Sequence, residues 1–185
     1  MHLHRTIIPS PLGPMVALAS DEGLCALEFN GPMRGATSTP YSRHERLDAR
    51  LRHWFPPHEI DERETPILKR TREWLAAYFN GERAEAAGVP LDLRGAAFER
   101  RVWQELREIP AGATSTYGAI ARRLGDAGAS RAVGAANGAN PVGIIVPCHR
   151  VIGSSGKLVG YGGGIDRKEW LLNHEARWRA QGSLF

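Results

Sequence analysis

The strongest constraint on the fold is a run of three helical patterns between residues 98 and 137. Apolar residues at positions 98, 102, 106 and 109 recur at helical spacing, and Pro110 ends this first pattern. A second helix is expected over about 116–124, and a third begins at Ser130, a suitable N-cap, and runs to about Asn137. Helices joined by connections this short allow a helix-turn-helix arrangement.

The first 80 residues follow a different pattern. Short apolar runs at 6–8, 15–18 and 24–29, separated by Pro, Gly and Asp, predict antiparallel strands joined by tight turns. Residues 31–40 are expected to form a loop. Helices are expected over 47–55, stopped by Pro56, and over about 66–80, with Gly81 at the C-terminus. The second of these helices is expected to bury Leu68, Leu75, Tyr78 and Phe79.

Residues 81–95 resemble a seam between two parts, because scattered charges there surround Gly88, Pro90 and Gly95. We therefore expect an α+β protein with two domains, an N-terminal one over 1–91 and a C-terminal one over 92–185. The last helix is expected to begin at Asp166, with Glu169 completing a capping box, and to continue to about residue 179.

Composition narrows the class of protein. No run approaches the roughly 18 apolar residues of a membrane span, and the first residues lead into no export signal, so we expect a cytoplasmic protein. Two cysteines make no disulfide framework, and Cys25, in an apolar run, is expected to be a buried small hydrophobe. Residues 92–185 hold 13 Lys and Arg against 8 Asp and Glu, a modest excess that favours a polyanionic partner.

Cys148, in the run Ile-Val-Pro-Cys-His-Arg, is a candidate nucleophile. Because a free thiol is only slightly ionised at neutral pH, it needs a base or a favourable field. His149 is adjacent, but neighbours in an extended segment point to opposite sides, so proton transfer requires a turn or a bridging water. Glu175 on the last helix orients His149 if that helix packs against the cysteine. The residues alone leave open a buried cysteine in a strand and a surface Glu175.

Two further segments of the C-terminal half have two readings each. Residues 131–139 place one Arg on a face of small residues, which suits either tight helix packing or a helix pressed into a DNA groove. The glycine-rich stretch 160–164 lacks the flanks of a phosphate-binding loop, so we interpret it as a mobile loop lining the cysteine pocket. The histidines show no metal-ligand spacing, and no metal site is expected.

The motifs around Cys148 resemble those of one family. The run Pro-Cys-His-Arg-Val-Ile-Gly at 147–153, with Asn140-Pro141 before it and Gly-Tyr-Gly-Gly-Gly at 160–164 after it, resembles the active-site signature of the O6-alkylguanine-DNA alkyltransferases, also called methylated-DNA–protein-cysteine methyltransferases. The resemblance covers nearly all of residues 92–178, including 98–103, 116–117, 130–134 and 168–172. The N-terminal half resembles the family more loosely, through its opening strands and residues 10–13.

The resemblance implies a ribonuclease H-like N-terminal domain and a winged helix-turn-helix-like C-terminal domain that carries the cysteine and binds DNA. Such a protein approaches double-stranded DNA from the minor groove and flips out O6-alkylguanine, and also O4-alkylthymine. It transfers the alkyl group irreversibly to Cys148, so each molecule reacts once. It needs no cofactor, because the alkyl group arrives on the DNA, and a monomer is expected.

The resemblance also implies three sets of site residues. The catalytic set is Cys148 as nucleophile, His149 as base through a water, Glu175 orienting His149, Asn140 bracing the turn and Tyr117 donating to the flipped base. The DNA-binding set is Arg131, which fills the gap left by the flipped base, with Ala132, Gly134, Ala135, Asn137, Thr116 and Ser130. The alkylguanine pocket is Tyr117, Val151, Tyr161, Gly162 and Lys168.

Three positions depart from the family pattern. Gly162 replaces a hydroxyl found in some relatives, so only its backbone N–H can reach the O6 atom. Ala139 replaces a longer polar or basic residue, with the loss of one phosphate contact. The N-terminal half has only Cys25 and scattered histidines for the structural zinc of some relatives, so none is expected.

Two other functions would also use a cysteine or an alkylated base. A non-catalytic binder of alkylated bases, recruiting another repair pathway, has another residue at the cysteine position, and the presence of Cys148 argues against it. A thiol hydrolase or redox enzyme is the third reading, and the chain has no Cys-x-x-Cys partner to support it.

Overall fold

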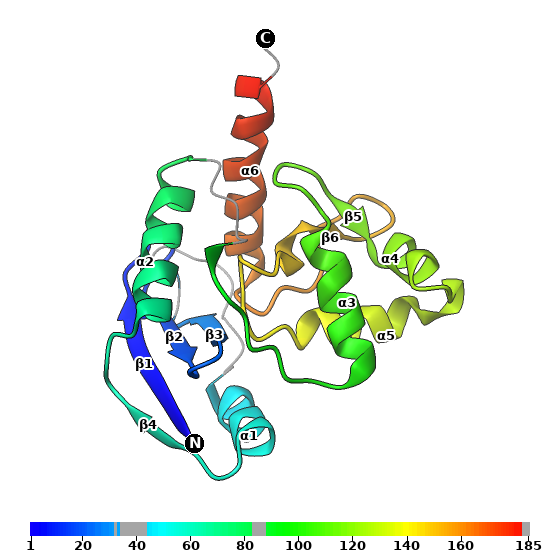
Figure 1. The fold of residues 1–185 in the computed structure, drawn as a ribbon. Helices are drawn as coiled ribbons and strands as arrows, with labels where there is room; N and C mark the ends of the chain where they lie inside the picture. The colour runs from blue at the N-terminus through cyan, green and yellow to red at the C-terminus, as the bar shows by residue number, and fades with distance from the viewer. Residues whose placement is uncertain (32, 34–43, 83–87, 183–185) are drawn as a thin grey trace. The chain divides into compact units, whose positions relative to one another are not determined.

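A computed structural model describes residues 1–31, 33, 44–82 and 88–182 of the 185-residue chain. Most of the predicted loop 31–40 lies outside these residues. The chain divides into two compact units, Met1–Arg94 and Gly95–Phe185, and Figure 1 shows the elements of each. Each unit combines helices with a small sheet, which confirms the predicted α+β class. No helix among the described residues combines the length and the apolar character needed to cross a membrane.

The first unit is built on a four-stranded sheet. Its strands are β1 (His2–Ile8), β2 (Met15–Ala19), β3 (Leu24–Phe29) and β4 (Glu59–Asp61), in the order β3-β2-β1-β4. The first three strands pair antiparallel, as the apolar runs predicted. In contrast, β4 pairs parallel to β1 and was not predicted, because its three residues are all exposed and only Ile60 is apolar.

Two helices accompany this sheet, α1 (His44–Trp54) and α2 (Pro66–Phe79). Apolar side chains of α1 join the core cluster with strand residues, in the set Leu3, Leu18, Cys25, Ala26, Leu47, Leu51 and Phe55. Burial raises the pKa of Cys25 to about 11, which makes this thiol unreactive, as expected for a core residue. The Thr65 hydroxyl caps α2 by accepting from the Leu68 N–H at 3.3 Å. Phe79 is only half-buried, contrary to the prediction, whereas Tyr78 is buried.

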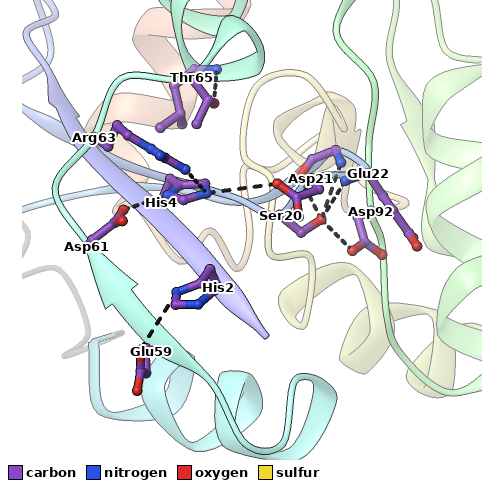
Figure 2. Close-up of polar contacts among 12 residues, drawn as sticks. His2, His4, Ser20, Asp21, Glu22, Glu59, Asp61, Arg63, Thr65 and Asp92 are labelled. Carbon is purple, nitrogen blue, oxygen red and sulfur yellow. Dashed lines mark hydrogen bonds and ion pairs between the residues drawn. The ribbon is translucent and has the colours of Figure 1, made fainter.

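A polar network ties the edges of the first unit together (Figure 2). His4, 1% exposed, hydrogen-bonds through Nδ1 to the Asp61 carboxylate at 2.5 Å, and the Arg63 guanidinium lies 3.1 Å from Nε2. This hydrogen bond lowers the pKa of Asp61. Ser20 donates to the Asp92 carboxylate at 2.8 Å, which holds residues 89–92 against the start of β3. Among the described residues, no group of three or more His, Cys, Asp or Glu side chains is placed to hold a metal ion.

The second unit contains three packed helices, α3 (Ala97–Arg107), α4 (Tyr117–Arg123) and α5 (Ser130–Gly138), and both α3 and α4 contact α5. The buried indole of Trp103 donates to the Ala136 carbonyl at 2.8 Å and joins α3 to α5. Strands β5 (Ser115–Thr116) and β6 (Val151–Ile152) pair parallel beside them, and the unit ends in α6 (Ile165–Gly182) (Figure 1).

Two predicted helix caps are wrong. A short 3-10 helix, η2 (Ala127–Ala129), runs directly into α5, so Ser130 already has helical dihedral angles and Asp126 caps η2 instead. Helix α6 begins at Ile165, and the Lys168 N–H donates to the Gly164 carbonyl at 3.2 Å. Asp166 therefore lies inside the first turn and not at the N-cap position that a capping box requires.

Candidate active site

The segment 142–146, before Cys148, is a tight turn and not an extended run, although four of its five residues are apolar and the fifth is glycine. The amide of Asn140 spans this turn, because Nδ2 donates to the Val146 carbonyl at 2.7 Å and Oδ1 accepts from the Val142 N–H at 3.0 Å. Ile144 has a φ of 69°, a left-handed conformation that β-branched residues rarely adopt. Asn140 therefore holds the chain in a strained turn directly before the cysteine.

Cys148 and His149 lie in a 3-10 helix, η3 (Cys148–Arg150). The Cys148 N–H donates to the Val146 carbonyl at 2.8 Å, and the Arg150 N–H donates to the Pro147 carbonyl at 3.0 Å. Cys148 is 2% exposed and His149 is completely buried. The expectation of an extended segment, with opposite side-chain directions, is corrected, because the backbone turns at these residues.

The carboxylate of Glu175, on α6, receives four hydrogen bonds. Its Oε1 binds His149 Nε2 at 2.9 Å and Arg150 Nη2 at 2.8 Å. Its Oε2 accepts from Arg150 Nε at 2.9 Å and from the Gly112 N–H at 3.1 Å. A third nitrogen of Arg150 donates to the Ile109 carbonyl at 2.6 Å. The carboxylate is therefore fixed in place and fully used as an acceptor.

The pKa values of this group indicate a neutral histidine beside an ionised carboxylate. Burial lowers the pKa of His149, although Glu175 acts in the opposite direction. Burial would raise the pKa of Glu175, but hydrogen bonds and charges from His149 and Arg150 outweigh it and hold this pKa far below its usual range. A neutral ring that faces a carboxylate donates from Nε2, which leaves Nδ1 as an acceptor. Nδ1 is buried and has no hydrogen-bond partner among the described residues.

The residues expected to line a base pocket surround η3. The Tyr117 hydroxyl donates to the Val159 carbonyl at 3.4 Å, and burial, together with a negative charge at Cys148, raises the pKa of Tyr117. Lys168 is fully buried and donates from Nζ to the Val151 and Val159 carbonyls at 2.6 and 2.7 Å. Burial lowers the pKa of Lys168 to about 8. The Tyr161 ring stands edge-on to that of His149, with centroids 6.5 Å apart.

The residues of the predicted DNA-binding set that lie on α5 differ in their exposure to solvent. Arg131, Ala132 and Ala135 are exposed, and Ser130 and Gly134 are partly exposed. Asn137 is 3% exposed, because it lies one turn after Val133 on the buried face of the helix, so the structure removes it from the exposed face. Thr116 caps α4, with its hydroxyl accepting from the Ala119 N–H at 3.2 Å.

Two residues that contribute to the site, Arg150 and Gly112, were not predicted from the sequence. Arg150 follows His149 directly, yet its binding to Glu175 depends on how α6 packs against η3. Gly112 contributes only a backbone N–H, for which no side-chain signal exists. The signal that could have identified Arg150 is its place between two residues already assigned to the site, His149 and Val151, because a cation that is buried there needs a partner.

Both units of the chain match domains of known proteins. Residues 3–93 match the profile of the ribonuclease-like domain of 6-O-methylguanine DNA methyltransferase, and residues 97–177 match the profile of its DNA binding domain. A methylated-DNA–protein-cysteine methyltransferase from Mycobacterium leprae is 59% identical over 173 residues, which cover 94% of this chain and 92% of the relative. A second, from Mycobacterium bovis, is 46% identical over the same shares of both chains.

A solved structure resembles the whole chain. The crystal structure of Mycobacterium tuberculosis OGT in complex with DNA has a TM-score of 0.74 and 41% sequence identity, and the match covers 96% of this chain and 94% of that one. The similarity in sequence and fold therefore includes both units.

Proposed function

The chain belongs to the family of 6-O-methylguanine DNA methyltransferases, and from this membership we propose that it repairs DNA by moving the alkyl group of an O6-alkylated guanine to the sulfur of Cys148. The observation that carries the assignment to Cys148 is its neighbour, a buried neutral histidine. One of its ring nitrogens has no partner in the described part of the chain, and an immobilised carboxylate binds the other. A nucleophile, a base and an orienting carboxylate are the three parts that activate a weak nucleophile.

The reaction is a single displacement at the alkyl carbon. The Cys148 proton passes through a water to Nδ1 of His149, and the thiolate sulfur attacks the alkyl carbon. An S–C bond forms as the bond from this carbon to O6 breaks, and its electron pair stays on the guanine. Tyr117 donates a hydrogen bond to the departing base and stabilises its developing charge. The product is a thioether, which has no easy route back to a thiol, so each molecule reacts once.

Glu175 acts through His149 and does not take up the proton. Its four hydrogen bonds and its lowered pKa keep it ionised, so it fixes the ring and stabilises the imidazolium that forms during the reaction. Asn140 does not touch the reacting atoms either; it braces the turn that presents Cys148.

The alkylguanine pocket is proposed to consist of Tyr117, Val151, Tyr161, Gly162 and Lys168. The contacts of Lys168 with two carbonyls support this assignment, because they connect β6 to the loop that follows it. Gly162 contributes its backbone, since it has no side chain to offer the O6 atom.

The exposed face of α5 is proposed to enter the minor groove of double-stranded DNA. Ala132, Gly134 and Ala135 let the helix approach closely, and Arg131 inserts where the alkylated base has flipped out. Ser130 and Thr116 lie at the starts of α5 and α4 and are proposed to face the phosphates, whereas buried Asn137 supports the helix from inside. The basic excess of residues 92–185 favours the same partner.

We also propose that the protein acts as a cytoplasmic monomer. Every residue of the proposed catalytic set comes from the unit Gly95–Phe185 of one chain, so no second copy is needed to complete the site. The reaction requires Cys148 as a thiol, and the cytoplasm keeps thiols reduced.

Mass spectrometry tests the function directly. After incubation with a duplex oligonucleotide that contains O6-methylguanine, the protein is expected to gain the mass of one methyl group, on the peptide that contains Cys148. Cys148→Ala is expected to bind the same DNA without this gain. Binding by the unaltered protein without a gain in mass would instead identify a non-catalytic binder, and turnover on a thioester would identify a thiol hydrolase.

A further inference from the structure

Arg167, on the first turn of α6, is a cation in an unusual environment. Its side chain is 1% exposed and is among the largest fully buried side chains of the described residues. Loss of hydration makes a buried guanidinium unfavourable, and burial lowers the pKa of Arg167 accordingly. The contacts of the Arg167 side chain indicate its role.

Arg167 binds the backbone next to Gly162. One of its terminal nitrogens, Nη1, donates to the Gly163 carbonyl at 2.9 Å. Tyr161, on the other side of Gly162, acts against the effect of burial on the pKa of Arg167. The Tyr161 ring in turn stands at 78° to the His149 ring. The guanidinium is thus bound to the backbone two residues after Tyr161, whose ring faces the proposed base.

Lys168, the next residue along α6, binds the Val151 and Val159 carbonyls. The two consecutive cations therefore hold carbonyls at positions 151, 159 and 163, which bracket most of the loop 153–164. This loop contains no helix or strand, and Gly156 and Gly160 have φ values of 79° and 50°. Because it has no ladder of backbone hydrogen bonds, its position depends on side chains such as these.

We propose that Arg167 is a positioning residue for alkyl transfer, which fixes the Gly163 carbonyl and thereby the adjoining backbone of Tyr161 and Gly162 where the flipped base must be met. The inference rests on the proposed function and adds a residue that does not touch the base. A small displacement of a fixed backbone donor slows a reaction without much change in affinity. Loss of Arg167 therefore lowers the maximal rate of transfer and leaves DNA binding nearly unchanged.

Arg167→Met tests this role, because methionine fills similar space without the charge. Replacing a buried charge by an apolar side chain often leaves stability unchanged or raises it. Under single-turnover conditions with O6-methylguanine duplex, the maximal rate is expected to fall about tenfold, while the half-saturating protein concentration stays within about twofold. Hydrogen exchange of the amides at 160–164 is expected to become faster in the same variant.

The matched control is Arg177→Met, the same change at an exposed position of α6, which is expected to leave rate and exchange unaltered. Arg167→Lys keeps the charge on a shorter side chain and is expected to show an intermediate rate, at least about threefold below that of the unaltered protein. A rate for Arg167→Met within about twofold of the unaltered protein overturns the inference. If Arg167→Met does not fold, an unaltered rate for Arg167→Lys overturns it equally.

The same experiment separates this inference from the proposed function. Methyl transfer by the unaltered protein is measured first, and its absence contradicts the function. Transfer by the unaltered protein with no effect of Arg167→Met contradicts the positioning role alone.

Discussion

At the scale of single residues, the chemistry depends on how one carboxylate is shared. Glu175 binds His149 and Arg150 at the same time, through Oε1 at 2.9 and 2.8 Å. Arg150 supports the ionised state of Glu175 and, by its positive charge, also lowers the pKa of His149. The arginine therefore limits the basicity that the carboxylate confers on the histidine, and the ring remains neutral and able to accept a proton.

Arg150→Met is expected to shift the pH dependence of alkyl transfer. Without the guanidinium the pKa of His149 is expected to rise, because Arg150 is one of the charges that lower it, so the pH below which the rate falls moves upward. Single-turnover rates over a range of pH measure this shift. Breaking a buried ion pair also destabilises the fold by about 3 kcal/mol, so the comparison is made below the unfolding temperature. An inflection at the same pH as in the unaltered protein contradicts the role given to Arg150.

Arg131→Ala separates base flipping from the chemical step. Arg131 is exposed on α5 and far along the chain from Cys148. Because only duplex DNA requires flipping, transfer from O6-methylguanine in a duplex is expected to slow by about tenfold or more. Reaction with free O6-benzylguanine, followed by the loss of reactive thiol, is expected to change little. Equal losses on both substrates would argue against insertion of Arg131 into the duplex.

At the scale of elements, the turn at 142–146 shows how a side chain can override an apolar pattern. A run of four apolar residues and one glycine favours a buried strand, yet the Asn140 amide binds both ends of the segment. The left-handed φ of Ile144 carries a strain of about 1–3 kcal/mol, which burial of its side chain offsets. The element that presents Cys148 is therefore a consequence of local hydrogen bonding and not of hydrophobic periodicity.

The exposed face of helix α5 is expected to determine the affinity for duplex DNA. Ala135→Glu places a negative charge and a longer side chain on the face that is proposed to enter the minor groove, and affinity for the negatively charged duplex is expected to fall about tenfold. Fluorescence anisotropy with a labelled oligonucleotide measures this change. The rate with free O6-benzylguanine should stay within about twofold. Ala76→Glu, the same change at an exposed position of α2, is the control, and an equal effect of both substitutions would show that total charge alone is responsible.

At the scale of the whole molecule, the two units differ in what they contain. The unit Met1–Arg94 contains its own core cluster and the polar network of His4, and it supplies none of the proposed catalytic residues. The unit Gly95–Phe185 contains buried ionisable groups around Cys148. The free energy of unfolding of the second unit is therefore expected to depend on pH, because core packing alone does not change with pH but buried ionisable groups do.

Acidification is expected to destabilise the protein in two steps. His149 has a lowered pKa in the folded state, so the stability it contributes is complete above pH 6.5, its ordinary value, and is lost as the pH falls through the folded pKa. Glu175 also has a lowered pKa, and its contribution is lost as the pH falls below 4.5 toward the folded pKa. Urea unfolding is expected to show a loss of roughly 1 kcal/mol or more for each pKa unit by which the folded pKa lies below the ordinary one.

His149→Gln tests the origin of the first step. The free energy of unfolding of this variant is expected to lose its dependence on pH between the ordinary pKa of histidine and that of glutamate. His53→Gln, the same change at an exposed position, is expected to keep this dependence. A full dependence in His149→Gln would assign the effect to another group.

The sequence by itself determined the elements that depend on local spacing and the residues that adjoin in the chain. The helical periods of α1, α2 and α3, the antiparallel strands β1 to β3 and the adjacency of Cys148 and His149 all follow from neighbours within a few residues. Only the tertiary structure decided which groups meet across long separations, such as Glu175 with Arg150 and with Gly112, and β4 with β1. The physical reason is that a local pattern specifies a conformation, whereas the partner of a buried charge is selected by the packing of whole elements.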